Sequence, residues 1–187
     1  TFTIDGSTNL WESGNFWPIS HANWMFENFE KETIEIFNLL FDETKILEER
    51  ITHFITFFDS KIPELKKLIN NDKINNHYHK DLRAIAIYLS LQYPKKYFLY
   101  KFSMVNSFAE KIGFSKLKRG KIENLKKYLI IANQIHDYII EDSTFLNEYS
   151  NYAKLEENYI DPYKHLLTQD FIYSVSKYLN IEEDKQS

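Results

Sequence analysis

The chain of 187 residues contains no cysteine, which excludes a disulfide framework and a thiolate metal site. It holds only four glycines and four prolines beside 17% aromatic residues, and so few turn-forming residues favour long helices over many short strands. No apolar run approaches the ~20 residues of a membrane span, and the N-terminus lacks the layout of a signal peptide, so we expect a cytoplasmic protein.

The net charge of −4 conceals an uneven distribution along the chain. Residues 1–60 carry eleven acids and three bases, whereas residues 94–127 carry two acids and ten bases. Residues 128–187 are acidic again, with eleven acids and four bases. A basic centre between acidic ends predicts that positive charge gathers on one part of the protein.

In chain order, the sequence predicts an all-α, irregular multi-helix domain of about eight or nine helices without a substantial sheet. Residues 1–20 are expected to form an irregular arm that is anchored by its aromatic side chains. Helices are expected from Ser20, from Thr33, after a cap at Asp42 or Thr44, and again from Ser60 with Pro63 in the first turn. A polar loop at 70–80 separates an arm and helical layer (1–70) from a central and C-terminal part (71–187), within one compact domain.

After the polar loop, a helix is expected over residues 81–93 that is apolar on most sides, and Pro94 should end it. A short helix over 103–112 follows, with Ser103 as its N-cap and Gly113 as its C-cap. After a basic loop at 116–121, the longest helix is expected over 122–140. Ser143 and Thr168 are expected to cap two further helices, and residues 181–187 should form a frayed tail.

Residues 93–102 form an unusual connector between two predicted helices, with five aromatic residues and three lysines in ten positions. This stretch is too apolar for a solvated loop. We expect its aromatic side chains to lock the preceding helix to the following one. Its lysines should join a basic face made by residues 111–127.

This basic segment is the strongest candidate for a binding site, because lysines neutralise phosphates and exposed aromatics stack on bases. The basic loop also precedes a helix N-terminus, which favours anions. The same positive surface could instead dock acidic regions of this protein or of a partner. The residues expected to contact nucleic-acid phosphates are Lys95, Lys96, Lys101, Lys118, Arg119 and Lys121.

Other kinds of site have weaker support in the sequence. The glycines stand at positions 6, 14, 113 and 120, too far apart for a phosphate-binding loop. A metal site at His77-x-His79 would need a third ligand, and one at His136-Asp137 would need both a further upstream histidine and a downstream aspartate. A helical ribonuclease would need a longer spacer than the sequence offers. We therefore interpret the loop histidines as exposed side chains, and Arg50 with His53 as a surface polar pair. The motifs concerned are His77-x-His79 with Asp72 or Asp81, His136-Asp137 with His53 or His79 and Asp161 or Asp170, and Arg50 with His53.

Four stretches between residues 79 and 173 resemble the region upstream of the motor in McrB-like AAA+ ATPases. They are His79-Lys-Asp-Leu-Arg-Ala-Ile-Ala-Ile-Tyr-Leu89, Tyr93-Pro-Lys-Lys-Tyr-Phe-Leu-Tyr-Lys-Phe102, Lys118-Arg-Gly-Lys-Ile-Glu-Asn-Leu125 and His165-Leu-Leu-Thr-Gln-Asp-Phe-Ile-Tyr173. The resemblance covers about the last hundred residues and contains no catalytic signature. Residues 1–70 show no such likeness.

This resemblance implies an accessory part of a modification-dependent restriction or defence system. McrB-like proteins are hexameric motors that hydrolyse GTP or ATP and work with a separate nuclease subunit. The resemblance therefore implies a chain without catalysis or a cofactor of its own, which engages DNA or connects target recognition to a motor outside this sequence. The DNA-reading modules of the family are mostly β-rich, and an all-α chain departs from them. The alternatives are a protein–protein interaction module and a small helical metal-dependent phosphohydrolase or nuclease.

Overall fold

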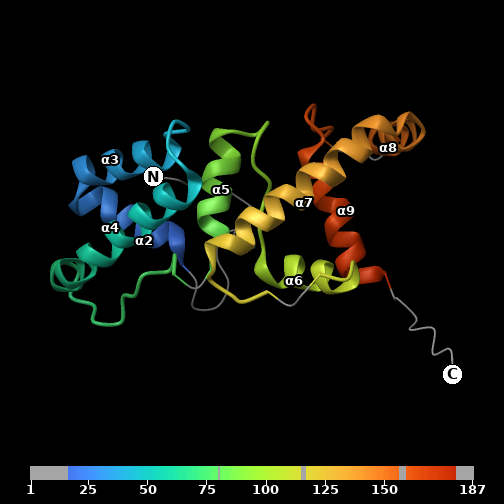
Figure 1. The fold of residues 1–187 in the computed structure, drawn as a ribbon. Coiled ribbons are helices and arrows are strands. Elements are labelled where there is room, and N and C mark those ends of the chain that lie inside the picture. Colours follow the sequence, from blue (N-terminus) through green and yellow to red (C-terminus); the bar gives the residue numbers. More distant parts are fainter. Residues whose placement is uncertain (1–16, 80, 115–116, 156–158, 180–187) are drawn as a thin grey trace, which may run out of the picture. The chain divides into compact units, whose positions relative to one another are not determined.

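The computed structural model describes residues 17–79, 81–114, 117–155 and 159–179. Within these ranges the chain forms eight α-helices, α2 to α9, and no β-strand, which confirms the expected all-α fold (Figure 1). The chain divides into two compact units, residues Thr1–Gln92 and Tyr93–Ser187. The position expected for a boundary, between residues 70 and 71, lies inside the first unit.

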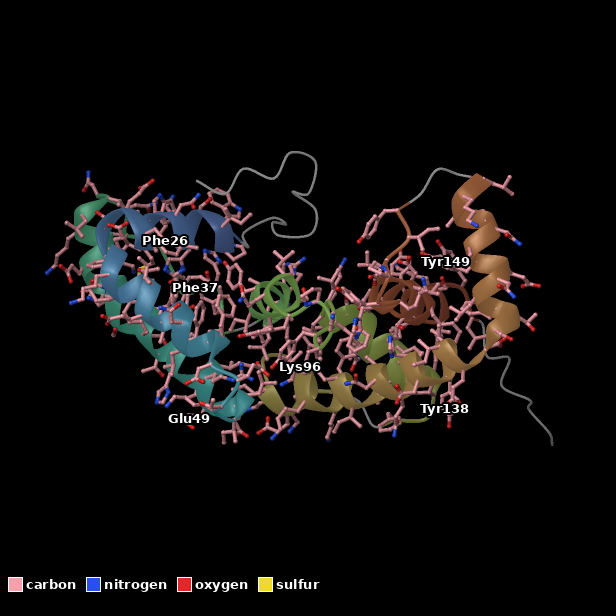
Figure 2. All side chains as sticks on the ribbon, turned by 90° about the horizontal axis from the view of Figure 1, so that it is seen from above. Phe26, Phe37, Glu49, Lys96, Tyr138 and Tyr149 are labelled. Atoms are coloured by element: carbon pink, nitrogen blue, oxygen red, sulfur yellow. The ribbon has the colours of Figure 1, made fainter. Side chains whose placement is uncertain are left out.

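The first unit contains four of these helices, and its core is largely aromatic. Helices α2 and α3 pack on α4, and α3 also contacts α5. The ring centroids of Phe54 and Phe58 are 4.7 Å apart, and Tyr78 is 4.7 Å from Phe58. Phe26 of α2 stacks on Phe37 of α3 at 5.4 Å (Figure 2). The helices are α2 (Pro18–Asn28), α3 (Glu30–Phe41), α4 (Leu47–Leu68) and α5 (Arg83–Gln92).

Helix α4 is one continuous element of 22 residues, so the helix restart expected at Ser60 and Pro63 is wrong. Pro63 lies inside the helix, where it has no N–H to donate and its ring crowds the preceding turn. A proline in a helix interior costs about 3 kcal/mol. The side chains of Phe58 and Leu65 are fully buried on either side of it. Burial of about 1.5–3 kcal/mol for each of them offsets that cost, so the helix continues.

The second unit contains the other four helices. Helix α6 packs on α9, and α7 contacts both α8 and α9. Ser107 Oγ of α6 donates a hydrogen bond to the carbonyl of Ser176 at 2.9 Å. Lys111 Nζ donates to the carbonyl of Val175 at 3.1 Å, which places a cation at the C-terminal end of α9. The helices are α6 (Phe102–Lys111), α7 (Ile122–Glu141), α8 (Ser143–Leu155) and α9 (His165–Tyr178).

Two expected helix ends are confirmed. Helix α5 ends at Gln92, two residues before Pro94, as the restriction on pre-proline residues predicts. Helix α6 is followed by Gly113 with φ +80°, a left-handed conformation that glycine adopts without strain. The amide of Phe114 then donates to the carbonyl of Ala109 at 2.8 Å, which closes the helix as a Schellman motif.

The expected N-caps of α4 and α6 are wrong. Asp42 accepts hydrogen bonds from the amide and hydroxyl of Thr44 in a turn before α4, whose N-cap is Ile46. Helix α6 begins at Phe102, so Ser103 lies in its first turn. Asp and Thr side chains can bond the backbone of a turn as well as that of a helix N-terminus. Asp42 and Thr44 are bonded to each other in the turn before α4, so neither caps that helix.

The N-caps expected for α8 and α9 also lie elsewhere. Asp142 Oδ1 accepts the amide of Phe145 at 2.9 Å, so Asp142 caps α8 and Ser143 is the first helical residue. Thr168 lies in the first turn of α9 and donates to the carbonyl of Lys164 at 2.8 Å. Asp161 instead binds the start of α9, where its Oδ2 accepts the amide of Leu166 at 2.9 Å.

Some sequence predictions fall outside the described residues, namely those for the arm up to residue 16 and for the tail at 181–187. Trp17, the first described residue of the arm, is half-exposed. Among the helices that the structure describes, none combines the length and the apolar character that crossing a membrane requires.

Candidate nucleic-acid interface

The connector of residues 93–102 separates its aromatic side chains from its lysines. Tyr97, Phe98 and Tyr100 are buried, with at most 4% of their surface exposed. Lys95 and Lys96, in contrast, are exposed. Because a buried ring offers no face to a nucleobase, these three aromatics cannot serve as a stacking platform.

The connector is anchored on α7 and α9 through its backbone and rings. The hydroxyl of Tyr128 donates to the carbonyl of Leu99 at 2.8 Å and lies 2.6 Å from Oε1 of Gln169. The ring of Tyr128 meets Tyr100 edge to face at 5.6 Å. Burial raises the pKa of the Tyr128 hydroxyl, so it remains a neutral donor. These contacts anchor the connector on α7 and α9, whereas the expectation that its aromatic side chains lock α5 to α6 stays a prediction.

The lysines at the start of the connector lie over aromatic rings. Lys95 Nζ is 5.0 Å from the centroid of Tyr163, and Lys96 Nζ is 5.6 Å from that of Tyr97. Contacts of this kind contribute about 0.5–1 kcal/mol at exposed sites. They restrain the two ammonium groups while leaving them accessible, and Figure 2 marks the position of Lys96.

The basic loop before α7 is held by two asparagine side chains. Asn106 Oδ1 on α6 accepts the amide of Leu117 at 2.9 Å. Asn124 Nδ2 in the first turn of α7 donates to the carbonyl of Lys118. Gly120 has φ +75°, so the chain turns there without strain. The loop exposes the side chains of Lys118, Arg119 and Lys121.

The six predicted phosphate-binding residues are all exposed, and all belong to the second unit. Lys118, Arg119 and Lys121 come together in one loop at the N-terminus of α7. Lys101 is the N-cap residue of α6. Lys95 and Lys96 precede it by five or six residues, which is a path of up to ~20 Å in an extended chain. The six residues therefore lie at three exposed places along the chain, namely the start of the connector, the N-cap of α6 and the basic loop. The loop carries the highest local charge.

Helix α7 carries charges that oppose its own macrodipole. A helix N-terminus has partial positive charge, yet the basic loop stands directly before it, and the first turn holds a single acidic residue, Glu123. The C-terminal turn contains no basic residue, and Glu141 and Asp142 lie at the negative end. Both arrangements raise the electrostatic energy of the isolated helix by about 0.3–1 kcal/mol per charge. An anion bound beside the loop would relieve the repulsion at the N-terminus.

Among the described residues of the first unit, the histidines that the sequence offers as candidate metal ligands do not come together with a third ligand. His79 Nε2 is bonded to the carboxylate of Asp59, and neither Asp72 nor Asp81 joins them. Arg50 is buried, where its Nη1 donates to the carbonyl of Leu40 at 2.8 Å. The interpretation of Arg50 as part of a surface pair is therefore wrong. Among the described residues, no group of three or more histidines, aspartates or glutamates could hold a metal ion.

Two buried histidines were missed by the sequence interpretation. His21 in α2 is fully buried, and neither ring nitrogen has a hydrogen-bond partner. His165, at the start of α9, stacks on His136 with ring centroids 4.7 Å apart and planes 15° apart. The two residues of that pair stand 29 positions apart, and no local pattern links them.

Comparison with known proteins adds no assignment, because no protein-family model matches the chain and neither a curated protein nor a solved structure matches it significantly.

Proposed function

We propose that this chain is a non-catalytic accessory domain of an McrB-like AAA+ restriction or defence ATPase, and that it contacts the DNA backbone through its second unit. The resemblance at 79–89, 93–102, 118–125 and 165–173 supports the family. In this proposal the motor and the nuclease subunit are the protein partners, and the chain couples target recognition to them.

The observation that carries the DNA contact is the exposure of all six basic residues in a segment with ten bases and two acids. Each lysine or arginine that neutralises a phosphate releases condensed counterions, which drives binding without reading sequence. The chain has only three arginines, and two of them, Arg50 and Arg83, are buried. Bidentate recognition of bases therefore has little support, and we expect charge-driven binding of a duplex.

A titration at two salt concentrations tests this function. A labelled 20-base-pair duplex and a single strand of equal length are titrated with the protein at 50 and 200 mM salt, and anisotropy is measured. The triple variant Lys118→Ala, Arg119→Ala, Lys121→Ala should bind more weakly. Its salt slope should fall by about 2 to 3, since each phosphate contact contributes about 0.9.

The matched control removes three exposed positive charges from the first unit, in the variant Lys31→Ala, Lys45→Ala, Lys73→Ala. This control should retain the affinity and salt slope of the wild type. Equal losses in the two triple variants would show that net charge alone matters. No measurable binding at 50 mM salt would remove the proposed DNA contact.

A second candidate function is protein–protein association, which exposed apolar side chains in the second unit favour. Tyr138 at the end of α7 is 75% exposed (Figure 2), and Leu155 at the end of α8 is 82% exposed. Aromatic side chains are enriched in interfaces, so such residues suit contact with a partner. Light scattering coupled to size exclusion separates this function from DNA binding, since it predicts self-association or complex formation that survives the basic-loop substitutions.

A further inference from the structure

The stacked imidazoles of His136 and His165 lie where three parts of the second unit meet. His136 comes from α7, His165 begins α9, and Phe98 of the connector meets the ring of His165 edge to face at 4.2 Å. The backbone of Pro94 interacts with the His165 ring and raises the pKa of His165, because a hydrogen bond to a carbonyl favours the protonated ring. This pair therefore contacts both the backbone and an aromatic side chain of the connector.

The hydrogen bonds define the protonation of both rings. A carbonyl oxygen only accepts, so His136 Nε2, which is 2.7 Å from the carbonyl oxygen of Tyr163, carries a hydrogen. His165 likewise donates to Pro94, and its Nδ1 is buried without a partner. A neutral His165 leaves this nitrogen bare. A second proton on it would have no acceptor and would place a cation against the face of His136.

The charged groups around the pair offer limited compensation for such a proton. From α7, Asp137 Oδ1 is 3.7 Å from His136 Nδ1, so it faces the other ring. In the turn before α9, the carboxylate of Asp161 already accepts the amides of Tyr163 and Leu166. Lys164 of the same turn donates to the Asp161 carbonyl. Lys95 of the connector lies over Tyr163 and adds positive charge nearby.

Two further ionisable groups stand close to this turn, on α8 and α9. Tyr149 on α8 lies below Lys164 Nζ, with 5.9 Å between the nitrogen and the ring centroid. Asp170 on α9 interacts electrostatically with Tyr149, and burial raises the pKa of the Asp170 carboxyl. The carboxylate of Asp161 raises the pKa of His165, and the same carboxylate is bound by two backbone amides.

We propose that the His136–His165 stack is a proton-operated clamp. Neutral His165 holds the connector against α7 and α9, whereas a second proton on the buried Nδ1 would have no acceptor, would lie against the His136 ring, and would release the connector. Release frees the backbone that carries Lys95 and Lys96, so acidification changes the exposed basic surface of the second unit. The clamp does not depend on DNA binding. Burial first, and then the neighbouring His136, lower the pKa of His165, while the Pro94 bond and Asp161 oppose this shift without cancelling it. The clamp therefore stays closed at neutral pH.

Hydrogen exchange of the connector amides tests the clamp. Exchange of residues 95–101 is measured by mass spectrometry at pH 7.5 and 5.5 and corrected for the intrinsic chemical rate. The released state should titrate with the ordinary histidine pKa of about 6.5, and the closed state binds the proton less readily. Opening should therefore increase as the pH falls, by at most about tenfold between these pH values. Helix α6 serves as the internal control, and its exchange should change much less.

Two variants remove the titrating group in different ways. His165→Phe keeps an aromatic ring in the stack, and His165→Gln keeps a donor for the Pro94 carbonyl. In whichever variant retains the helical circular dichroism of the wild type, corrected connector exchange should be the same at both pH values. The clamp is refuted if wild-type connector exchange does not change, if α6 changes equally, or if a folded variant retains the full response.

Discussion

The buried imidazole of His21 should make the first unit lose stability in mild acid. Its ring is enclosed by Phe58 at 5.0 Å, Tyr78 at 5.8 Å and His77 at 5.9 Å between centroids. Burial is the main cause, and the neighbouring His77 a second one, of a pKa lowered from 6.5 to about 4. Asp59 opposes this shift without cancelling it.

The sign and size of the effect follow from proton linkage. The folded state binds its proton less readily than the unfolded state, so stability is fully present above pH 6.5 and falls as the pH drops toward 4. Between pH 7.5 and 5.0 the two pKa values predict a loss of about 2 kcal/mol. Below pH 4 both states are protonated, and the contribution of His21 levels off.

Urea unfolding followed by tryptophan fluorescence measures this loss. All three tryptophans, at positions 11, 17 and 24, belong to the first unit, so the signal reports the unit that contains His21. His21→Phe keeps an aromatic ring without a titrating nitrogen. Its absolute stability will shift by about 1–3 kcal/mol through changed packing, but its pH dependence should be flatter than that of the wild type.

The exposed His53 on α4 provides a matched control, since His53→Phe makes the same chemical change outside the core. This control should keep the wild-type pH dependence. The reasoning is refuted if His21→Phe and wild type lose the same free energy of unfolding between pH 7.5 and 5.0. Carboxylates that titrate in this range contribute equally to both proteins and cancel in the difference.

Two substitutions, one directly after α6 and one inside α4, test the backbone arguments. Gly113→Ala should destabilise the protein by about 1 kcal/mol because φ is +80° there, although an added Cβ meets no atom within 4 Å; urea unfolding followed by circular dichroism measures it, and Gly113→Asn should lose less. Pro63→Ala should stabilise α4 by about 1–3 kcal/mol by restoring a backbone hydrogen-bond donor. An unchanged or lower unfolding midpoint for Pro63→Ala would show that the helix has adapted to the proline.

The helical class and the character of the connector could be predicted because both depend on local patterns. Within residues 93–102, the residue types alone predict that most of the aromatic rings are buried and that the lysines are exposed. The end of α5 before Pro94 and the left-handed Gly113 follow from backbone sterics. These features need no knowledge of which helices meet.

The features that could not be predicted depend on distant packing. Pro63 is a strong helix-breaking signal, yet burial of Phe58 and Leu65 overrides it. The pairing of His136 with His165 exists only because α7 contacts α9. Similarly, the burial of His21 depends on Phe58 from α4 and on Tyr78 from the loop before α5. A single polar residue in an amphipathic pattern does not indicate that it is buried among aromatic rings of distant segments.

Because basic residues precede α7 and acidic residues lie at its C-terminal end, the second unit carries charges of opposite sign at the two ends of this helix. Twenty residues span about 30 Å, with lysines and an arginine before one end and acidic residues at the other. A polyanion approaching at low ionic strength would rotate the unit before contact, so that the basic loop arrives first. Such orientation increases the association rate constant and disappears as salt shortens the Debye length to about 8 Å.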